Sequence, residues 1–389
     1  MDKLVEQYRR LLSVTEVGFF RYMHQEVNWK SRMIGITGPR GVGKTTLVLQ
    51  HIKRNLNPDE TLYVNAEDFY FADNRLIDLA DYFVKRGGRF LCIDEIHKFE
   101  NWAQELKLIY DFHPELNVIF TGSSILDIRK GASDLSRRAV MYNMQGLSFR
   151  EYLVLFHEIF VEVYTLDDLL NHRVEFSDLK YPLLLFADYL KRGYYPFSKE
   201  VEFNQKLLQI INQTLETDIP FYAGMNVSTG RKLKQLLAVI AQSVPFKPNY
   251  SSIANALAVS RNNISDYCQF IEEAGMIMQL RDATGGIKGL GKVSKIYLDN
   301  TNLIHCIANE KSNLGNIRET FFLNQMRVRN EVFDSAVADF QIGENTFEVG
   351  GKSKGIRQIK GIQHGFIVKD DIEYGQFNTI PLWHFGLTY

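Results

Sequence analysis

A lysine and two threonines follow a glycine-rich turn near residue 40, and these residue types could hold a polyphosphate. The spacing is Gly38-x-x-x-x-Gly43-Lys44-Thr45. Glycines let the backbone turn so that successive N–H groups point at phosphate oxygens, and a helix that begins there adds its positive end. Lys44 is expected to reach the β- and γ-phosphates, and the Thr45 hydroxyl to ligate Mg²⁺. The predicted nucleotide-binding residues are Gly38, Pro39, Arg40, Gly41, Val42, Gly43, Lys44, Thr45 and Thr46.

A pair of carboxylates, Asp94 and Glu95, ends an apolar run further along the chain. Asp94 is expected to hold Mg²⁺ through water, and Glu95 to polarise the attacking water as the catalytic base. An acidic cap on a surface strand would use the same residues. Small-molecule kinases do not need this glutamate, and the guanine-reading Asn/Thr-Lys-x-Asp segment is missing from the expected place. The doublet therefore favours ATP hydrolysis.

Hydroxyl and guanidinium groups follow the next two apolar runs. Ser123 lies in a Gly-Ser-Ser turn after residues 117–121, and Arg137 and Arg138 precede residues 139–144. Ligands gather at the carboxyl ends of parallel strands, so Ser123 is expected to sense the γ-phosphate. An arginine could neutralise charge in the transition state of its own or a neighbouring subunit. An ordinary turn and solvated surface charge are the alternatives.

These reactive residues need a sheet to position them, and the chain from 31 to 145 alternates short apolar runs with amphipathic stretches. This alternation predicts an α/β domain with a parallel sheet covered by helices. The expected strands are 33–37, 61–66, 90–94, 117–121 and 139–144. The expected helices are 45–55, 75–86, 102–112 and 124–130.

Bulk composition describes an ordinary globular chain. Its 389 residues suffice for two or three domains, and 45% hydrophobic with 23% charged residues excludes wholesale disorder. The net charge of −1 means that any nucleic-acid contact needs a local basic face. Three scattered cysteines indicate a reducing compartment, and no apolar run is long enough to cross a bilayer. A cytoplasmic location without membrane contact is expected.

Several further segments carry a family resemblance. They are Leu62-Tyr-Val-Asn, Ile93-Asp-Glu-Ile-His-Lys98, Leu106-Lys-Leu-Ile-Tyr-Asp111, Leu135-Ser-Arg-Arg138 and Leu147-Ser-Phe-Arg-Glu-Tyr152. Together with the glycine-rich loop they resemble the AAA+-type ATPases of bacteria and archaea, in the subgroup with a C-terminal domain of unknown function.

This resemblance implies a P-loop NTPase sheet in the strand order 5-1-4-3-2. It also implies ATP and Mg²⁺ binding by Lys44, Thr45, Asp94 and Glu95, a serine sensor and a catalytic Arg138. Arg137 stands where relatives usually have glycine, so the choice between the two arginines stays open. Many such ATPases form rings and others work as single-chain switches, so an oligomer is one option.

Residues 250–277 have the pattern of a helix-turn-helix, and residues 280–298 that of a Gly-rich hairpin. Together they predict a winged helix. Residues 231–300 contain nine basic and five acidic residues, a local net charge of +4. The residues expected to contact duplex DNA are Arg261, Asn262, Asn263, Lys288 and Lys292. Winged helices also dock proteins, and Glu272 with Glu273 would oppose phosphate, so a protein partner is the alternative.

The last stretch contains carboxylates at Glu319, Asp339 and Glu348, followed by Lys352. We expect Glu319 to open a helix and Asp339 to lie in a strand that spans 334–342; further strands are expected at 346–349, 364–368 and 381–385. The residue types resemble the metal-binding PD-(D/E)xK core of restriction endonucleases. That pattern places lysine at position 350, where this chain has glycine. A degenerate nuclease-like domain is therefore predicted, and a β-rich docking domain is the alternative.

The predicted organisation places a P-loop core first and partner-binding modules after it. The domains are a helical lead-in (1–30), the ATPase core (31–145), a helical lid (146–230), a winged helix (231–310) and a mixed α+β nuclease-like domain (311–389). The predicted function is an ATP-hydrolysing switch that contacts DNA or a protein partner. The competing hypotheses are an ATP-regulated, metal-dependent nuclease and a signalling scaffold that binds nucleotide with little turnover.

Overall fold

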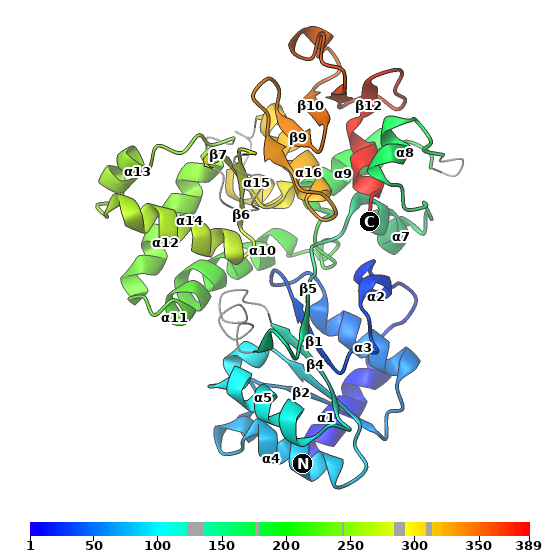
Figure 1. Cartoon of the computed structure of the whole chain (residues 1–389), viewed down its shortest axis with the longest axis vertical. Helices are drawn as coiled ribbons and strands as arrows, with labels where there is room; N and C mark the ends of the chain where they lie inside the picture. The colour runs from blue at the N-terminus through cyan, green and yellow to red at the C-terminus, as the bar shows by residue number, and fades with distance from the viewer. Residues whose placement is uncertain (123–134, 176–178, 243–244, 284–291, 309–312) are drawn as a thin grey trace. The chain divides into compact units, whose positions relative to one another are not determined.

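The computed structural model of the chain describes residues 1–122, 135–175, 179–242, 245–283, 292–308 and 313–389 (Figure 1). The chain divides into two compact units, Met1–Gly146 and Leu147–Tyr389. Among these residues no helix has both the length and the apolar character needed to cross a membrane.

The first unit is built on a parallel five-stranded sheet whose strand order is β2-β3-β4-β1-β5. The strands are β1 (Met33–Thr37), β2 (Thr61–Asn65), β3 (Phe90–Asp94), β4 (Asn117–Gly122) and β5 (Val140–Asn143). This order is the one that the family resemblance implies, and each strand lies within one residue of its predicted ends. The predicted α/β fold class of this part is confirmed.

Helices pack beside this sheet, and their ends follow local sequence signals. They are α1 (Asp2–Val14), α2 (Met23–Glu26), α3 (Lys44–Asn55), α4 (Leu76–Val84) and α5 (Trp102–Phe112), with 3₁₀ turns at Phe69–Ala72 and Ile96–Lys98. α1 contacts β2 and α3 (Figure 1) and buries Leu4, Tyr8 and Leu12, the spacing of one helix face. The predicted helix 124–130 lies outside the described residues.

Gly38, directly after β1, makes a close approach that excludes any side chain. Its φ is +149°, and a β-carbon placed on it would lie 2.1 Å from the backbone oxygen of Met144. A main-chain oxygen cannot rotate away as a flexible side chain can. We expect Gly38→Ala to lower the free energy of unfolding by about 2 kcal/mol or more, measured by urea denaturation. Gly18→Ala is the control, because a β-carbon there meets nothing within 4 Å; an equal loss in both variants would contradict the explanation.

The second unit begins with helices and contains a small antiparallel sheet. The helices are α7 (Phe149–His157), α8 (Leu166–Leu170), α9 (Pro182–Arg192), α10 (Phe203–Gln213), α11 (Ile219–Tyr222) and α12 (Val227–Gln242), with a π-helical segment at Thr214–Asp218. Next come α13 (Tyr250–Ala256) and α14 (Arg261–Glu273), then the antiparallel pair β6 (Ile277–Arg281) and β7 (Val293–Leu298). The helical stretch and the helix-turn-helix pattern thus correspond to helices at the predicted places.

The end of the chain forms α15 (Thr301–Ala308), α16 (Leu314–Met326) and a mixed sheet of order β12-β11-β10-β9-β8. Its strands are β8 (Phe333–Asp334), β9 (Phe340–Ile342), β10 (Asn345–Gly350), β11 (Gly365–Lys369) and β12 (Thr379–Pro381), with 3₁₀ turns at Ile356–Gln358 and Leu382–Leu387. β10 pairs with β11 in parallel and with β9 in antiparallel fashion. The predicted mixed α+β character is therefore present.

Three details of this region were predicted wrongly. The run 381–385 is not a strand, because only Thr379–Pro381 is extended and a 3₁₀ helix follows. A continuous buried apolar run does not distinguish the two. Asp339 lies in a bend that interrupts the run predicted over 334–342, and Glu319 lies within α16 because that helix begins five residues earlier, capped by Asn313.

Candidate nucleotide site

The loop between β1 and α3 has the backbone of a phosphate cradle. Gly38, Gly41 and Gly43 have φ angles of 149°, 84° and 98°. These conformations are accessible to glycine but strained for other residues. Gly43 is also the residue before the first turn of α3, where unpaired N–H groups and the helix dipole favour an anion.

The Lys44 side chain folds over this loop. Its ammonium group donates hydrogen bonds to the carbonyl oxygens of Gly38 and Pro39, each at 2.9 Å. The residue is 5% exposed, and burial lowers its pKa to about 8, opposed by the charges of Glu95 and Asp94. The cation thus lies at the loop where an incoming phosphate would need it.

Asp94, at the end of β3, is the centre of a hydrogen-bond cluster. Its Oδ2 accepts from the Thr45 hydroxyl and from the Tyr63 hydroxyl, both at 2.6 Å. Its Oδ1 accepts from the Thr121 hydroxyl and, at 3.2 Å, from the Glu95 backbone N–H. The two side chains predicted as Mg²⁺ ligands, Thr45 and Asp94, are therefore in direct contact.

Glu95 turns away from the strand in a left-handed conformation, with a φ of 50°. Such a backbone is strained in a residue other than glycine and is often retained for function. The Glu95 Oε2 atom lies 3.3 Å from Nε2 of His97. Burial, with the nearby cations, lowers the pKa of His97 to about 3, so its imidazole is neutral and can orient the glutamate by donating Nε2–H.

The arginines predicted to assist hydrolysis lie far from this cluster. Arg138 forms a two-pronged ion pair with Asp111 at the end of α5, with both N–O distances 2.9 Å, and Arg137 is exposed. β5 runs parallel to β1 and pairs Val140 with Ile34. Arg138 therefore lies about six strand residues, or ~20 Å, from Gly38. The arginines precede β5 and therefore lie at the amino ends of the parallel strands, whereas the phosphate loop lies at their carboxyl ends. The prediction that either arginine assists hydrolysis in its own chain is therefore wrong in this arrangement.

Two residues of the cluster had no predicted role. Tyr63 and His97 contact the two carboxylates, although neither was assigned chemistry from the sequence. Tyr63 reaches Asp94 because β2 pairs with β3 in the register Asn65 with Asp94. That neighbour relation is a property of the strand order and not of local sequence. Ser123, the predicted sensor, lies outside the described residues.

The predicted DNA-contacting residues of α14 are at the surface of the second unit. Arg261, Asn262 and Asn263 are exposed in the first turn, and the Ser260 hydroxyl caps the helix by accepting from the Asn263 N–H. Lys292 is exposed, whereas Lys288 lies outside the described residues. Glu272, expected to repel phosphate, accepts hydrogen bonds from the backbone and side chain of Gln279, each at 2.7 Å. Its charge is thus directed toward β6.

The tail brings its predicted carboxylates into one cluster of interacting charges, in which Glu348 is buried and Glu319 and Asp339 are partly exposed. The Tyr297 hydroxyl donates to Glu319 at 2.8 Å, and Asp339 accepts from the Val349 backbone N–H at 2.8 Å. The Glu348 side chain is 1% exposed and pairs with Lys354. The predicted Lys352 is exposed, so this choice of lysine is wrong. The loop after β10 returns Lys354 to Gly350, against which its side chain packs.

The charge state of this cluster should affect stability. Burial, followed by the charge of Asp339, raises the pKa of Glu319 to about 7. The folded chain therefore binds more protons than the unfolded chain between about pH 4.5 and 7, and its stability falls as pH rises through that range. We expect Glu319→Gln to remove this loss. The free energy of unfolding of the variant, taken relative to that of the unchanged chain, should then be higher at pH 8 than at pH 5. Urea denaturation at both pH values measures it, and a parallel decline in both proteins would contradict the assignment.

Comparison with known proteins agrees with this geometry. Residues 30–153 match the family model of the AAA domain, and residues 183–314 match that of a domain of unknown function, DUF8612. The uncharacterized protein MJ1637 of Methanocaldococcus jannaschii is 27% identical over 290 residues, which are 69% of this chain and 61% of that protein. The chain thus spans about three-fifths of the length of this relative.

Solved structures give weaker likenesses. The Walker-type ATPase PABY2304 of Pyrococcus abyssi has 11% identity and a TM-score of 0.44, covering 75% of this chain and 96% of that chain. AMPPCP-bound DnaA from Aquifex aeolicus has 12% identity and a TM-score of 0.28, covering 69% and 86%. Because both TM-scores lie below 0.5, neither likeness bears on function. The glycine-rich loop, the carboxylate pair, the sheet order and the family match together identify the chain as one that carries a P-loop domain of the AAA type, followed by a domain of unknown function.

Proposed function

We propose that the chain is a magnesium-dependent ATPase that works as a switch. Lys44 and the loop amides bind the phosphates, Thr45 and Asp94 hold Mg²⁺, and Glu95 takes a proton from the attacking water. His97 keeps Glu95 in place through its neutral imidazole. Arg137 or Arg138 is proposed to act on the site of a neighbouring copy, since neither is near the phosphate loop of its own chain.

The contact between Thr45 and Asp94 is the observation that carries this proposal. A hydroxyl and a carboxylate separated by 2.6 Å, next to a glycine-rich cradle, are oxygen donors of the kind that Mg²⁺ prefers. No group of three or more His, Cys, Asp or Glu side chains within the described ranges could hold a metal ion. Two protein oxygens suffice here, because Mg²⁺ commonly completes its shell with water and substrate phosphates.

The proposed output of the switch is contact with duplex DNA through α14. Arg261 and the two asparagines after it are residue types that bind phosphate or read bases. In the part of the chain that the structure describes, Arg261 has no carboxylate partner, whereas Glu272 is engaged by Gln279 and lies 3.6 Å from Arg281. The exposed first turn of α14 therefore presents positive charge.

A steady-state ATPase assay with and without duplex DNA tests both parts of the proposal. We expect Mg²⁺-dependent turnover that DNA stimulates, and we expect Arg261→Ala to abolish the stimulation. Lys206→Ala is the matched control, because Lys206 is an exposed cation already paired with Glu200. An ATPase rate that DNA does not change would contradict DNA as the partner and favour a protein partner. Tightly bound ADP with negligible turnover would favour the scaffold hypothesis.

A metal-dependent nuclease is the second candidate, favoured by the ion pair of Lys354 with Glu348 and by the charge of Asp339, which acts on both Glu319 and Glu348. These three carboxylates are not close enough together to form a three-residue metal group among the described residues. Lys354 lies six positions after Glu348, whereas the nuclease pattern places its lysine two positions after the glutamate. Lys354 nevertheless forms an ion pair with Glu348. Plasmid incubated with Mg²⁺ or Mn²⁺ tests this candidate. Cleavage that is lost in both Asp339→Asn and Glu348→Gln would establish it, while intact plasmid would leave Lys354 as a neutralising partner of a buried carboxylate.

A further inference from the structure

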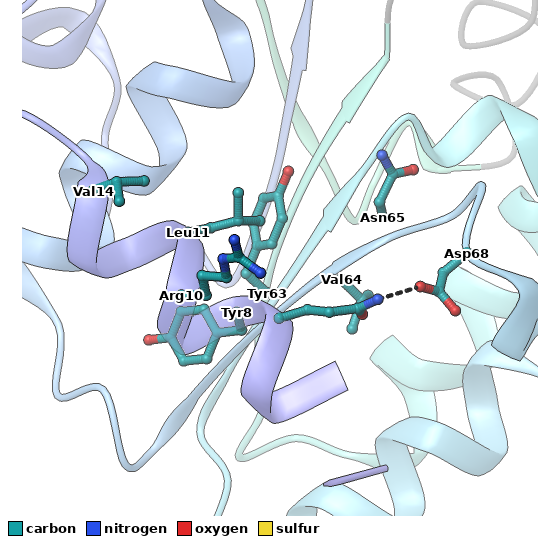
Figure 2. Close-up of a pocket in the computed structure, with 9 residues that line it drawn as sticks. Tyr8, Arg10, Leu11, Val14, Tyr63, Val64, Asn65 and Asp68 are labelled. Atoms are coloured by element: carbon teal, nitrogen blue, oxygen red, sulfur yellow. Dashed lines mark hydrogen bonds between the residues drawn. The ribbon is translucent and has the colours of Figure 1, made fainter. Parts of the chain in front are cut away.

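A pocket of about 520 Å³ lies between α1 and the carboxyl end of β2, apart from the phosphate loop (Figure 2). The volume is within the usual range of small-molecule sites. Leu11 and Val14 contribute apolar surface from α1 and are 41% and 73% exposed. Tyr63, from β2, lines the same pocket. The pocket therefore offers an aromatic and aliphatic surface to a flat apolar group.

Most carboxylate and amide groups around the pocket are already engaged. Asp68 accepts from the Gln7 side chain at 3.1 Å, shown as the dashed line in Figure 2, and from the Tyr70 backbone N–H at 2.8 Å. Asn65 uses its oxygen to accept from the Glu67 N–H at 2.8 Å. The oxygens of Asp68 and Oδ1 of Asn65 thus already accept from the protein, although the Asp68 carboxylate keeps its negative charge.

Two donors on this rim remain available. The Arg10 guanidinium has no ion-pair partner, and Nδ2 of Asn65 has no acceptor, within the described part of the chain. Arg10 and Asn65 line the same pocket as Tyr63 (Figure 2). Neighbouring Arg9 differs, because it pairs with Asp59 at 3.0 Å. A cation and an amide donor beside apolar surface select a ligand that is an anion with an apolar body.

We propose that the pocket between α1 and β2 binds a small organic anion, with its acid group on Arg10 and Asn65 and its flat apolar body on Leu11, Val14 and Tyr63. The ligand class is an aromatic carboxylate or sulfonate of one or two rings. This site is separate from the cradle around Lys44, which contributes no residue to the pocket lining.

Tyr63 connects this pocket to the nucleotide site. Its ring lines the pocket, while its hydroxyl donates to the same Asp94 oxygen that Thr45 contacts. An anion packed on the ring restricts Tyr63 to the position in which it orients Asp94. Tyr63 is thus a positioning residue, and the ligand and Mg²⁺–nucleotide strengthen each other's binding reciprocally. This second step rests on the proposed role of Asp94.

Calorimetric titration of the full nucleotide-free chain with naphthalene-2-sulfonate tests the site itself. We expect saturable binding that Arg10→Gln weakens about tenfold, the effect of one charge-assisted contact. Arg9→Gln is the matched control and should bind as the unchanged chain does. Val14→Trp should block binding by filling the mouth. Absence of binding, or binding that Arg10→Gln and Val14→Trp leave intact, overturns the proposal.

A second titration tests the connection through Tyr63. Saturating naphthalene-2-sulfonate is expected to tighten Mg²⁺–ADP binding about fivefold, near the lower end of typical couplings. Tyr63→Phe keeps the ring and removes the hydroxyl, so it should bind the probe normally and lose the coupling. Coupling that persists in Tyr63→Phe contradicts the route. Failure of ADP to bind at all would refute the proposed nucleotide function, while the probe titration would still decide independently whether the pocket binds an anion.

Discussion

Glu95→Gln is expected to bind ATP as tightly as the unchanged chain and to hydrolyse it roughly 10² to 10⁴-fold more slowly. The amide retains the size of the side chain and can still contact His97, but it cannot accept the proton of the attacking water. Binding depends on the loop amides and Lys44, which the substitution does not touch. Single-turnover hydrolysis and equilibrium binding of ATP, measured on the same preparation, separate the two effects.

Glu67→Gln provides the matched control for this variant. Glu67 is an exposed carboxylate whose nearest cation is Lys98 at 3.5 Å, so its loss removes one negative charge without touching Asp94. We expect turnover of the control to stay within about twofold of the unchanged chain, since exposed pairs contribute little. If Glu95→Gln retained full turnover, Glu95 would have no part in the mechanism.

Lys44→Ala is expected to weaken ATP binding by about 100-fold or more, because it removes the cation that would contact the phosphates. Lys53→Ala is the control from the same helix, since Lys53 is exposed and donates to the carbonyls of Ser13 and Thr15. Calorimetry with ATP and Mg²⁺ gives the affinities. Thermal unfolding of each variant verifies that the loop still folds without the contacts to Gly38 and Pro39. Equal affinities for both variants would exclude Lys44 from the site.

The first unit could be predicted closely because its local signals agree with one another. Four of the five apolar runs are followed directly by glycine or an acid, which sets the strand ends. The glycine and lysine spacing of the loop before α3 is typical of a phosphate-binding loop. The strand order was predicted from the family resemblance and not from the periodicity of apolar residues. The contact between Thr45 and Asp94 could also be anticipated, because Asp94 ends β3 and Thr45 follows the loop after β1. The carboxyl ends of these parallel strands lie at the same end of the sheet.

Contacts that depend on neighbouring strands could not be read from the sequence. Tyr63 looks like an ordinary buried strand residue until β2 is known to lie beside β3. His97 looks like a surface histidine after a carboxylate, yet a 3₁₀ turn buries it against Glu95. The contacts of Tyr63 and His97 depend on how the backbone folds around them, and the pattern of side chains along the sequence does not specify that fold.

The tail shows a different limit. The nuclease pattern places a lysine two positions beyond the glutamate, at position 350, where this chain has glycine, so Lys352, two residues further along the same strand face, was named as the displaced lysine. β10 ends at Gly350, so the alternation of faces along a strand no longer applies, and the turn that follows places Lys354 on the carboxylate. The 3₁₀ helix at Leu382–Leu387 was missed because complete burial hides the difference between extended and helical backbone.

The direction of β5 has a consequence for how the proposed ATPase would be assayed. Arg138 pairs with Asp111 at the amino ends of the strands, opposite to the end where Lys44 lies, so in the proposed mechanism Arg137 or Arg138 acts on the site of a second molecule. Specific activity would then climb with protein concentration instead of remaining constant, and a dilute preparation could look inert while every chain in it was correctly folded.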